Sequence, residues 1–202
     1  MDSKNHQTSR LAGFLFLAGL LVALPIALAA NVRLPAVIGD HMVIQQDKPV
    51  AIWGWAARGE QVTLRLAGQE KKVRAGVDGK WQAVFAPLKA GGAALELDVV
   101  GEKGPDVIVR DILVGEVWIC SGQSNMEWTV QGLASPLPEI LRADNPSLRL
   151  FLVPKRTSDR PLDDVNAKWT ACTPETVRPF SAVAYYFGLE LQKRLGVPVG
   201  LI

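Results

Sequence analysis

The hydrophobic pattern of this chain changes at about residue 112, and the change divides it into two regions of different fold class. From Asn31 to about Ile112, apolar residues alternate with polar ones, as in strands that bury one face. Three runs show this alternation: Val62, Leu64 and Leu66; Trp81, Ala83 and Phe85; and Leu95, Leu97 and Val99. Turn signals separate these runs at roughly ten-residue spacing, as in sandwiches of short strands. The pattern predicts a β-sandwich module over residues 30–111, without helices.

Glycine-containing dipeptides mark the expected turns, because glycine accepts positive φ angles at little cost. They are Arg58-Gly59, Ala67-Gly68, Asp78-Gly79, Gly91-Gly92 and Gly104-Pro105. The Asp78-Gly79 pair stands between two strand-like runs and predicts a tight β-hairpin there.

Residues 112–202 alternate strand-like and helix-like segments. A short helix is expected over Leu137–Ala143, strands over Leu148–Val153 and from Val197 onward, and a polar surface loop over Lys155–Asn166. A longer helix is predicted from a Ser181 cap to Leu195, ended by Gly196, with Ala184, Phe187, Gly188, Leu191 and Leu195 as its apolar face. Alternation of this kind predicts a parallel α/β sheet in a doubly wound arrangement.

The stretch Val114–Trp128 carries the candidate chemistry. Its apolar first half predicts a strand, which is followed by Ser121-Gly122-Gln123 and then by Ser124 at the expected start of a helix. A serine at the carboxyl edge of a sheet can attack a carbonyl while backbone N–H groups hold the developing oxyanion. The alternative is that Ser124 only caps the helix, a role that serine often takes.

The string Gly122-Gln123-Ser124-Asn125-Met126 resembles the nucleophile block of SGNH-type carbohydrate esterases. With Trp118 to Ser121 before it and Glu127-Trp128 after it, the string is similar to the sialate O-acetylesterase family. Residues Leu34–Gln46 resemble the opening of that family more loosely. The resemblance implies a β-sandwich ahead of a flavodoxin-like, parallel-sheet SGNH-hydrolase domain, of which 112–202 is the amino-terminal part. It implies Ser124 as nucleophile, with Gly122, Gln123 and Asn125 flanking it and shaping the turn.

The same resemblance implies that the chain is a fragment. In that family a glycine-bearing loop, an Asp and a His follow downstream, and none of these blocks is present in the 202 residues. The histidines of this chain, His6 and His41, match neither position, and a serine without a base is a weak nucleophile. The expected function is removal of O-acetyl groups from sialic acid or related sugars, with this chain alone nearly inactive. Two alternatives stay open: an acetyl xylan esterase-like deacetylase, and a non-catalytic, glycan-binding secreted β-sandwich.

Residues 1–29 have the layout of a secretory signal peptide. Lys4 and Arg10 precede an uncharged apolar run, and Ala27-Leu28-Ala29 forms a small-x-small cleavage site. An uncleaved anchor helix is the alternative, but Pro25 and the small residues after it favour cleavage. The expected location is therefore secreted or periplasmic, without stable membrane insertion after cleavage.

Composition excludes several other classes of function. The net charge of +2 and the absence of a basic run argue against a nucleic-acid partner. No Cys/His cluster has metal-ligand spacing, so neither a metal site nor a cofactor is expected. Cys120 and Cys172 could form a disulfide in an exported protein, but Cys120 is expected to pack as a free thiol.

Three tryptophans of the first region leave a choice. Trp53, Trp55 and Trp81 could stack on sugar rings, because indoles are flat, or could fill the core of a small sandwich, which the short strands favour. His41 precedes an apolar strand in a different region from Ser124, and a structural or exposed role is expected for it.

Overall fold

The computed structural model describes residues 31–135 and 137–202, so the predicted signal peptide lies outside the described residues. The first region holds β1 (Val43–Gln45), β2 (Val50–Trp55), β3 (Gln61–Leu66), β4 (Gln69–Arg74), β5 (Lys80–Phe85), β6 (Leu95–Gly101) and β7 (Val107–Trp118). The second holds α1 (Ser124–Glu127), η1 (Val130–Gly132), α2 (Leu137–Arg142), β8 (Asn145–Phe151), β9 (Trp169–Cys172), α3 (Pro174–Val177), α4 (Ala182–Leu195) and β10 (Val199–Leu201). Within the described part of the chain, no helix is long and apolar enough to cross a bilayer.

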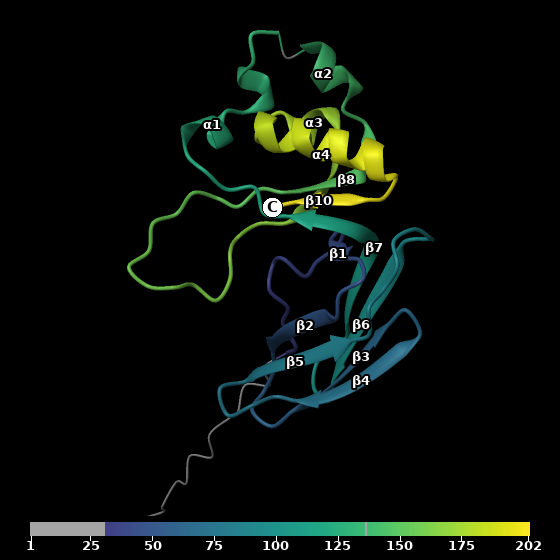
Figure 1. Ribbon diagram of the computed structural model, residues 1–202. Helices are drawn as coiled ribbons and strands as arrows, with labels where there is room; N and C mark the ends of the chain where they lie inside the picture. The colour runs from purple at the N-terminus through teal and green to yellow at the C-terminus, as the bar shows by residue number, and fades with distance from the viewer. Residues whose placement is uncertain (1–30, 136) are drawn as a thin grey trace, which may run out of the picture.

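A mixed sheet extends through both regions of the described chain. Its strand order is β4-β3-β6-β7-β10-β8-β9, with β1 also paired to β7, and β2 and β5 form a separate two-stranded sheet. Figure 1 shows strands in the lower part of the molecule and helices gathered over β8 and β10 in the upper part. Few helices accompany this sheet, and β7 is the strand shared by both parts.

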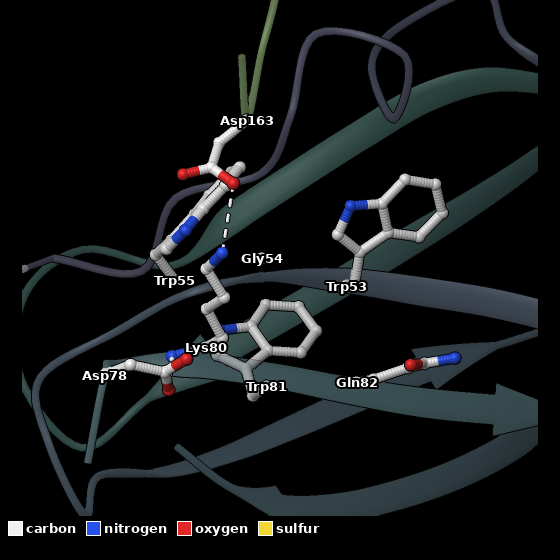
Figure 2. A pocket seen from close by; sticks show the side chains of 8 residues that line it. All are labelled: Trp53, Gly54, Trp55, Asp78, Lys80, Trp81, Gln82 and Asp163. Atoms are coloured by element: carbon white, nitrogen blue, oxygen red, sulfur yellow. Dashed lines mark hydrogen bonds and ion pairs between the residues drawn. The ribbon is translucent and has the colours of Figure 1, made fainter. Parts of the chain in front are cut away.

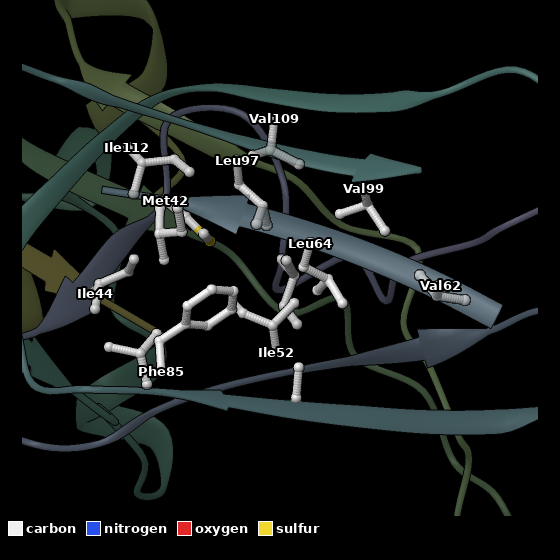
Figure 3. Close-up of a cluster of buried hydrophobic side chains, with 14 of the residues drawn as sticks. Met42, Ile44, Ile52, Val62, Leu64, Phe85, Leu97, Val99, Val109 and Ile112 are labelled. Carbon is white, nitrogen blue, oxygen red and sulfur yellow. The ribbon is translucent and has the colours of Figure 1, made fainter. Parts of the chain in front are cut away.

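The β2–β5 sheet faces the antiparallel strands β3, β6 and β7 across one hydrophobic core. The predicted alternation is confirmed, because every second residue of β3 and β5 is buried. Figure 3 shows these side chains meeting between the strands, with Phe85 and Leu64, each 1% exposed or less, near the centre. Burial of this many aliphatic groups is the main source of stability in such a module.

All five predicted turns contain a glycine with positive φ, but the predicted hairpin is wrong. Gly79 has φ +78°, yet the strands on either side, β4 and β5, pair with β3 and β2 respectively and lie in different sheets. The two-residue hairpin is instead at Ala67-Gly68, where both residues have positive φ and β3 pairs with β4. Two successive positive φ angles match the twist of antiparallel strands.

Strand β7 bends at Asp111, where the hydrophobic pattern changes in the sequence. Asp111 has φ +55°, and β7 has one extra residue relative to β6 between its pairs with Leu97 and Leu95. Such a bulge bends a strand and increases its twist. Before the bulge β7 pairs antiparallel with β6, and after it β7 pairs in parallel with β1 and then β10.

The second region contains the predicted parallel strands in the order β7-β10-β8, with β9 added antiparallel to β8. Helix α4 has the predicted ends: the Ser181 hydroxyl accepts from the Ala184 N–H at 3.3 Å, and Gly196 is left-handed. Its predicted apolar face is only partly right. Ala184 and Gly188 are buried, whereas Phe187 is 41% exposed and contacts the Trp118 ring edge-on.

Gly115 sets how closely β7 can approach the segment that leads into β10. A Cβ atom on Gly115 would lie 1.9 Å from the Pro198 carbonyl oxygen, which accepts the Glu116 N–H at 2.9 Å. Gly115→Ala should therefore lower the free energy of unfolding by about 3 kcal/mol, because backbone must move and a ladder hydrogen bond is strained. Urea unfolding followed by tryptophan fluorescence measures this.

Gly39→Ala is the matched control for that substitution. A Cβ on Gly39 would meet its nearest neighbour, the Ala36 oxygen, at 3.4 Å, an ordinary contact. This variant should unfold within about 1 kcal/mol of the parent protein. Equal stability of the two variants would contradict the packing described for Gly115.

Candidate active site

Ser124 lies just beyond the carboxyl end of β7, as predicted. The strand ends at Trp118, residues 119–123 form a connection, and Ser124 is the first residue of α1. In Figure 1 this connection leaves the end of β7 and rises to α1 beside the helices. The parallel strands β10 and β8 end at the same edge of the sheet. The carboxyl edge of such strands is where open α/β sheets bind ligands.

The capping alternative for Ser124 is wrong. Gln123 occupies the N-cap position of α1, and no side-chain hydrogen bond caps this helix. Ser124 is exposed, and within the described residues its hydroxyl has no hydrogen-bond partner. The hydroxyl is therefore free to react with a group that arrives from solvent.

Two backbone N–H groups at the start of α1 are also free. The N–H groups of Met126 and Glu127 bond to the Gln123 carbonyl, whereas those of Ser124 and Asn125 have no backbone acceptor among residues 31–135 and 137–202. Helix starts leave such donors unpaired, and they can hold an anion. Because α1 is only four residues long, the donors themselves matter more than the helix dipole.

Gly122, which is expected to shape the turn before Ser124, does not do so through a left-handed backbone angle. It is not among the residues with positive φ, so the turn does not need glycine for its dihedral angles. A Cβ on Gly122 would instead lie 3.2 Å from the Met126 Cβ. Glycine at this position thus allows the connection to pass close to the first turn of α1.

Contacts with the start of α4 fix the segment that follows Ser124. The Ala182 N–H donates to the Trp128 carbonyl at 2.8 Å, and the Ser181 hydroxyl donates to the Met126 sulfur at 3.3 Å. The Trp128 indole N–H donates to the Gly132 carbonyl at 2.9 Å. The bonds from Ala182 and Ser181 join the motif to a helix more than fifty residues away in sequence, which is a support that the local pattern does not encode.

A cavity of about 540 Å³ opens beside the motif at the carboxyl ends of β7, β8 and β10. Ser124 itself is not part of its wall, although Gly122 and Met126 on either side are. The wall also includes Cys120, Glu127, Phe151, Lys155, Phe180 and Ile202. Most of it is apolar, and the Lys155 ammonium pairs with the Glu127 carboxylate at 2.8 Å. The volume is within the usual range for small-molecule sites.

The wall contains residues that the sequence did not assign to the site. Phe180 and Ser181 precede α4, and Leu152 to Lys155 begin the loop after β8. The alternation of strands and helices indicated that the carboxyl ends of parallel strands would meet here. It did not indicate which loop residues would reach the motif.

Among residues 31–135 and 137–202, no histidine contacts Ser124. The His41 Nδ1 lies 2.6 Å from an Asp111 carboxylate oxygen, and the Arg149 guanidinium binds both oxygens of that carboxylate at 2.6 and 3.1 Å. The Arg149 and His41 partners hold the pKa of Asp111 below its ordinary value, Arg149 having the larger effect. His41 is therefore part of an ion-pair cluster at the β7 bulge, in the structural role expected for it; His6 lies outside the described residues.

Both cysteines are free thiols. Cys172 is fully buried, and burial with the nearby Asp144 carboxylate raises the pKa of its thiol to about 12. Cys120 is half-buried in the cavity wall, and burial raises the pKa of its thiol as well. No group of three or more His, Cys, Asp or Glu side chains within the described ranges could hold a metal ion.

Comparison with known proteins adds to this geometry. The sialate O-acetylesterase of Mus musculus is 33% identical over 91% of this chain, and that of Homo sapiens is 34% identical over 84%. A crystal structure of a carbohydrate acetylesterase from Xanthomonas citri superposes with a TM-score of 0.81 at 35% identity over 85% of this chain. No protein-family model matches the sequence.

The alignments cover only part of those proteins. The chain spans 38% of the mouse protein, 36% of the human protein and 39% of the Xanthomonas citri chain. Sequence identity and shared fold nevertheless extend over both regions of this chain, because each comparison covers more than four fifths of it. Along most of its length, this chain is homologous to the sialate O-acetylesterases.

Proposed function

We propose that this chain carries the nucleophile of a carbohydrate esterase that removes O-acetyl groups from sialic acid or related sugars. One observation carries the proposal: Ser124 has an exposed hydroxyl that does not cap helix α1. It lies at the carboxyl edge of a parallel sheet, next to a cavity large enough for a sugar ester. Homology to sialate O-acetylesterases and the fold shared with a carbohydrate acetylesterase support acetylated sugars as the substrate class.

The chemistry at Ser124 follows from these groups. The Ser124 oxygen attacks the acetyl carbonyl, and its proton passes to a base. The free N–H groups of Ser124 and Asn125 stabilise the negative charge that develops on the carbonyl oxygen. The sugar oxygen leaves with a proton, and water then hydrolyses the acetyl-Ser124 ester. Gly122, Gln123 and Asn125 shape the turn that presents the hydroxyl.

The base comes from outside this chain in our proposal. Serine needs a base within hydrogen-bond reach, and His41 does not contact Ser124 or line the cavity beside it, because its ring lies at the β7 bulge with Asp111. A histidine and an aspartate from polypeptide beyond these 202 residues would complete the site, so the chain by itself is expected to turn over esters very slowly. The partial alignment with the relatives is consistent with such a contribution.

The fold and location belong to the same proposal. Residues 30–111 form a β-sandwich module, and residues 112–202 form the amino-terminal part of an SGNH-type, flavodoxin-like domain. The facing sheets around Phe85 and the parallel order β7-β10-β8 support this division. Residues 1–29 direct the protein out of the cytoplasm and are removed, which leaves it secreted or periplasmic, with acetylated glycans rather than nucleic acid or membrane as partners.

A substrate comparison tests the function. Acetate release by the full protein is measured on O-acetylated sialic acid and on acetylated xylan, at matched concentrations of ester groups. The proposal expects a higher kcat/KM on the sialic acid ester. Higher kcat/KM on xylan would indicate an acetyl xylan esterase-like enzyme, and no hydrolysis of either ester would leave a non-catalytic glycan-binding protein.

A further inference from the structure

The outer face of the β2–β5 sheet carries two tryptophans side by side. Strand β2 buries Val50, Ile52 and Gly54, so Trp53 and Trp55 point to the opposite face. On β5, their antiparallel partners are Gln82 and Lys80. Alternating strand geometry therefore arranges two indoles and two polar side chains as a two-by-two group on one face.

A pocket of about 460 Å³ lies over this group. Its wall includes the four residues of the two-by-two group, with Gly54, Asp78 and Trp81. Asp163, from the loop after β8, closes one side and pairs with the Lys80 ammonium at 3.0 Å. Figure 2 shows Trp53 and Trp55 on opposite sides of Lys80, with Asp163 above it.

The tryptophans divide between core and surface, so the core expectation is right for Trp81 and wrong for Trp53. Trp81 is 4% exposed, and its ring lies against Gly54, where a Cβ would approach within 2.8 Å. Trp53 is 40% exposed. The Arg33 guanidinium lies 3.7 Å from the centre of the Trp55 ring and covers one of its faces, which fixes this indole.

One buried polar atom of Trp81, a residue that the pocket touches, lacks a partner. The Trp81 indole N–H is buried and has no hydrogen bond with any described residue. A buried donor without an acceptor costs about 1–3 kcal/mol, so such a group is usually satisfied by a water or a ligand. Because Trp81 belongs to the buried face of β5, opposite to Trp53, this donor does not itself mark the outer pocket.

We propose that this pocket binds a neutral pyranose unit of a glycan, with one sugar face on Trp53. The apolar C–H face of a pyranose fits an exposed indole, while Gln82, Lys80, Asp78 and Asp163 supply donors and acceptors for its hydroxyl groups. One cation and two carboxylates make the wall net negative, and Lys80 already pairs with Asp163. This charge disfavours an anionic sugar. The choice of a carbohydrate rests on the proposed function.

The binding surface and the candidate active site share one loop. Leu152 to Lys155, at its start, line the cavity beside Ser124, and Asp163, nearer its end, lines the tryptophan pocket. A second residue of this loop, Asp164, pairs with Arg33 at 2.9 Å and so holds the loop to the β2 side. Glycan bound at Trp53 would thus sit on the segment that also forms a wall of the catalytic cavity.

Isothermal titration calorimetry with sugars that carry no O-acetyl ester tests the inference without using hydrolysis. The probes are xylohexaose, cellohexaose and mannohexaose as neutral glycans, and sialyllactose as the anionic one. At least one neutral hexasaccharide should bind with a submillimolar Kd. Trp53→Ala should weaken that binding at least 10-fold, Trp53→Phe at most about 3-fold because a flat ring remains, and Val84→Ala not at all. Val84 is 48% exposed on β5 and lies outside the pocket.

A measurement on the unaltered protein covers the case in which Trp53→Ala folds poorly. The bound hexasaccharide should protect Trp53 from oxidation by N-bromosuccinimide, whereas Trp128, 58% exposed and outside the pocket, should stay reactive. Absence of binding by all three neutral probes, binding of sialyllactose alone, or unchanged affinity in Trp53→Ala would overturn the inference. Because the probes carry no O-acetyl esters, these outcomes are independent of whether Ser124 cleaves esters.

Discussion

Replacing Ser124 with alanine in the full protein should lower kcat for acetate release by at least about 10³-fold, because the covalent route is lost. KM should change little, since the cavity wall does not include Ser124. Fold should be unaffected, because the side chain is exposed and makes no hydrogen bond within the described residues. Steady-state acetate release gives kcat and KM, and urea unfolding checks that the variant is as stable as the parent protein.

Two other serines make this test specific. Ser121 precedes Ser124 by three residues and lines the cavity, so it is the competing nucleophile. Ser158 is exposed in the loop after β8, where its hydroxyl donates to the Arg160 carbonyl, and it serves as the remote control. Ser158→Ala should retain full activity. Loss of activity in Ser121→Ala together with full activity in Ser124→Ala would show that Ser121, not Ser124, is the nucleophile. Labelling by a serine-directed phosphonate that persists in Ser124→Ala would also contradict the assignment to Ser124.

Replacing Asp111 with asparagine should lower the free energy of unfolding by about 2–3 kcal/mol. Arg149 is 3% exposed, and Asp111 neutralises it through two hydrogen bonds. The cost is placed below that of a fully buried pair because 38% of the Asp111 side chain is exposed. Asparagine keeps the shape and tolerates the φ of +55°, so the charge is what changes.

The pH dependence of stability gives this prediction a second readout. The folded state lowers the pKa of Asp111 below its ordinary value of 3.8, mainly through Arg149. Its contribution is therefore complete above the unfolded pKa and is lost as the pH falls through the lower, folded pKa. The difference between the parent protein and Asp111→Asn should shrink as the pH falls below about pH 4.

Glu190→Gln is the matched control, because Glu190 pairs with Arg194 at 2.6 Å on the exposed side of α4. An exposed pair one helical turn apart contributes about 0.3–0.5 kcal/mol, so this variant should unfold close to the parent protein. A loss in Asp111→Asn no larger than that in Glu190→Gln would mean that the cluster at the β7 bulge is only a surface ion pair.

Local sequence determined much of this structure, because strand alternation, helix capping and turn chemistry act between near neighbours. The alternation of Val62, Leu64 and Leu66 placed their side chains in a core, and Ser181 and Gly196 marked the ends of α4. The same kind of pattern located Ser124 at the end of a strand. Each of these features depends on residues within about one or two turns or a single strand.

Longer-range choices were not accessible to such patterns. Strand β9 and helix α3 went unpredicted, and a correct turn at Gly79 was assigned to a hairpin because a turn does not specify the sheet that each strand joins. The wall of the cavity beside Ser124 also required residues from the loop after β8 and the start of α4.

The sequence by itself thus determined the alternating strands of the core, the serine that stands at a strand end and the family that the chain resembles. Only the tertiary structure decided that Gln123 rather than Ser124 caps α1, that His41 is bound to Asp111, and that Trp53 faces outward while Trp81 is buried. The physical reason is that capping, burial and ion pairing depend on which partners the folded chain brings within a few ångströms, and for His41 and Trp53 those partners are far away in sequence.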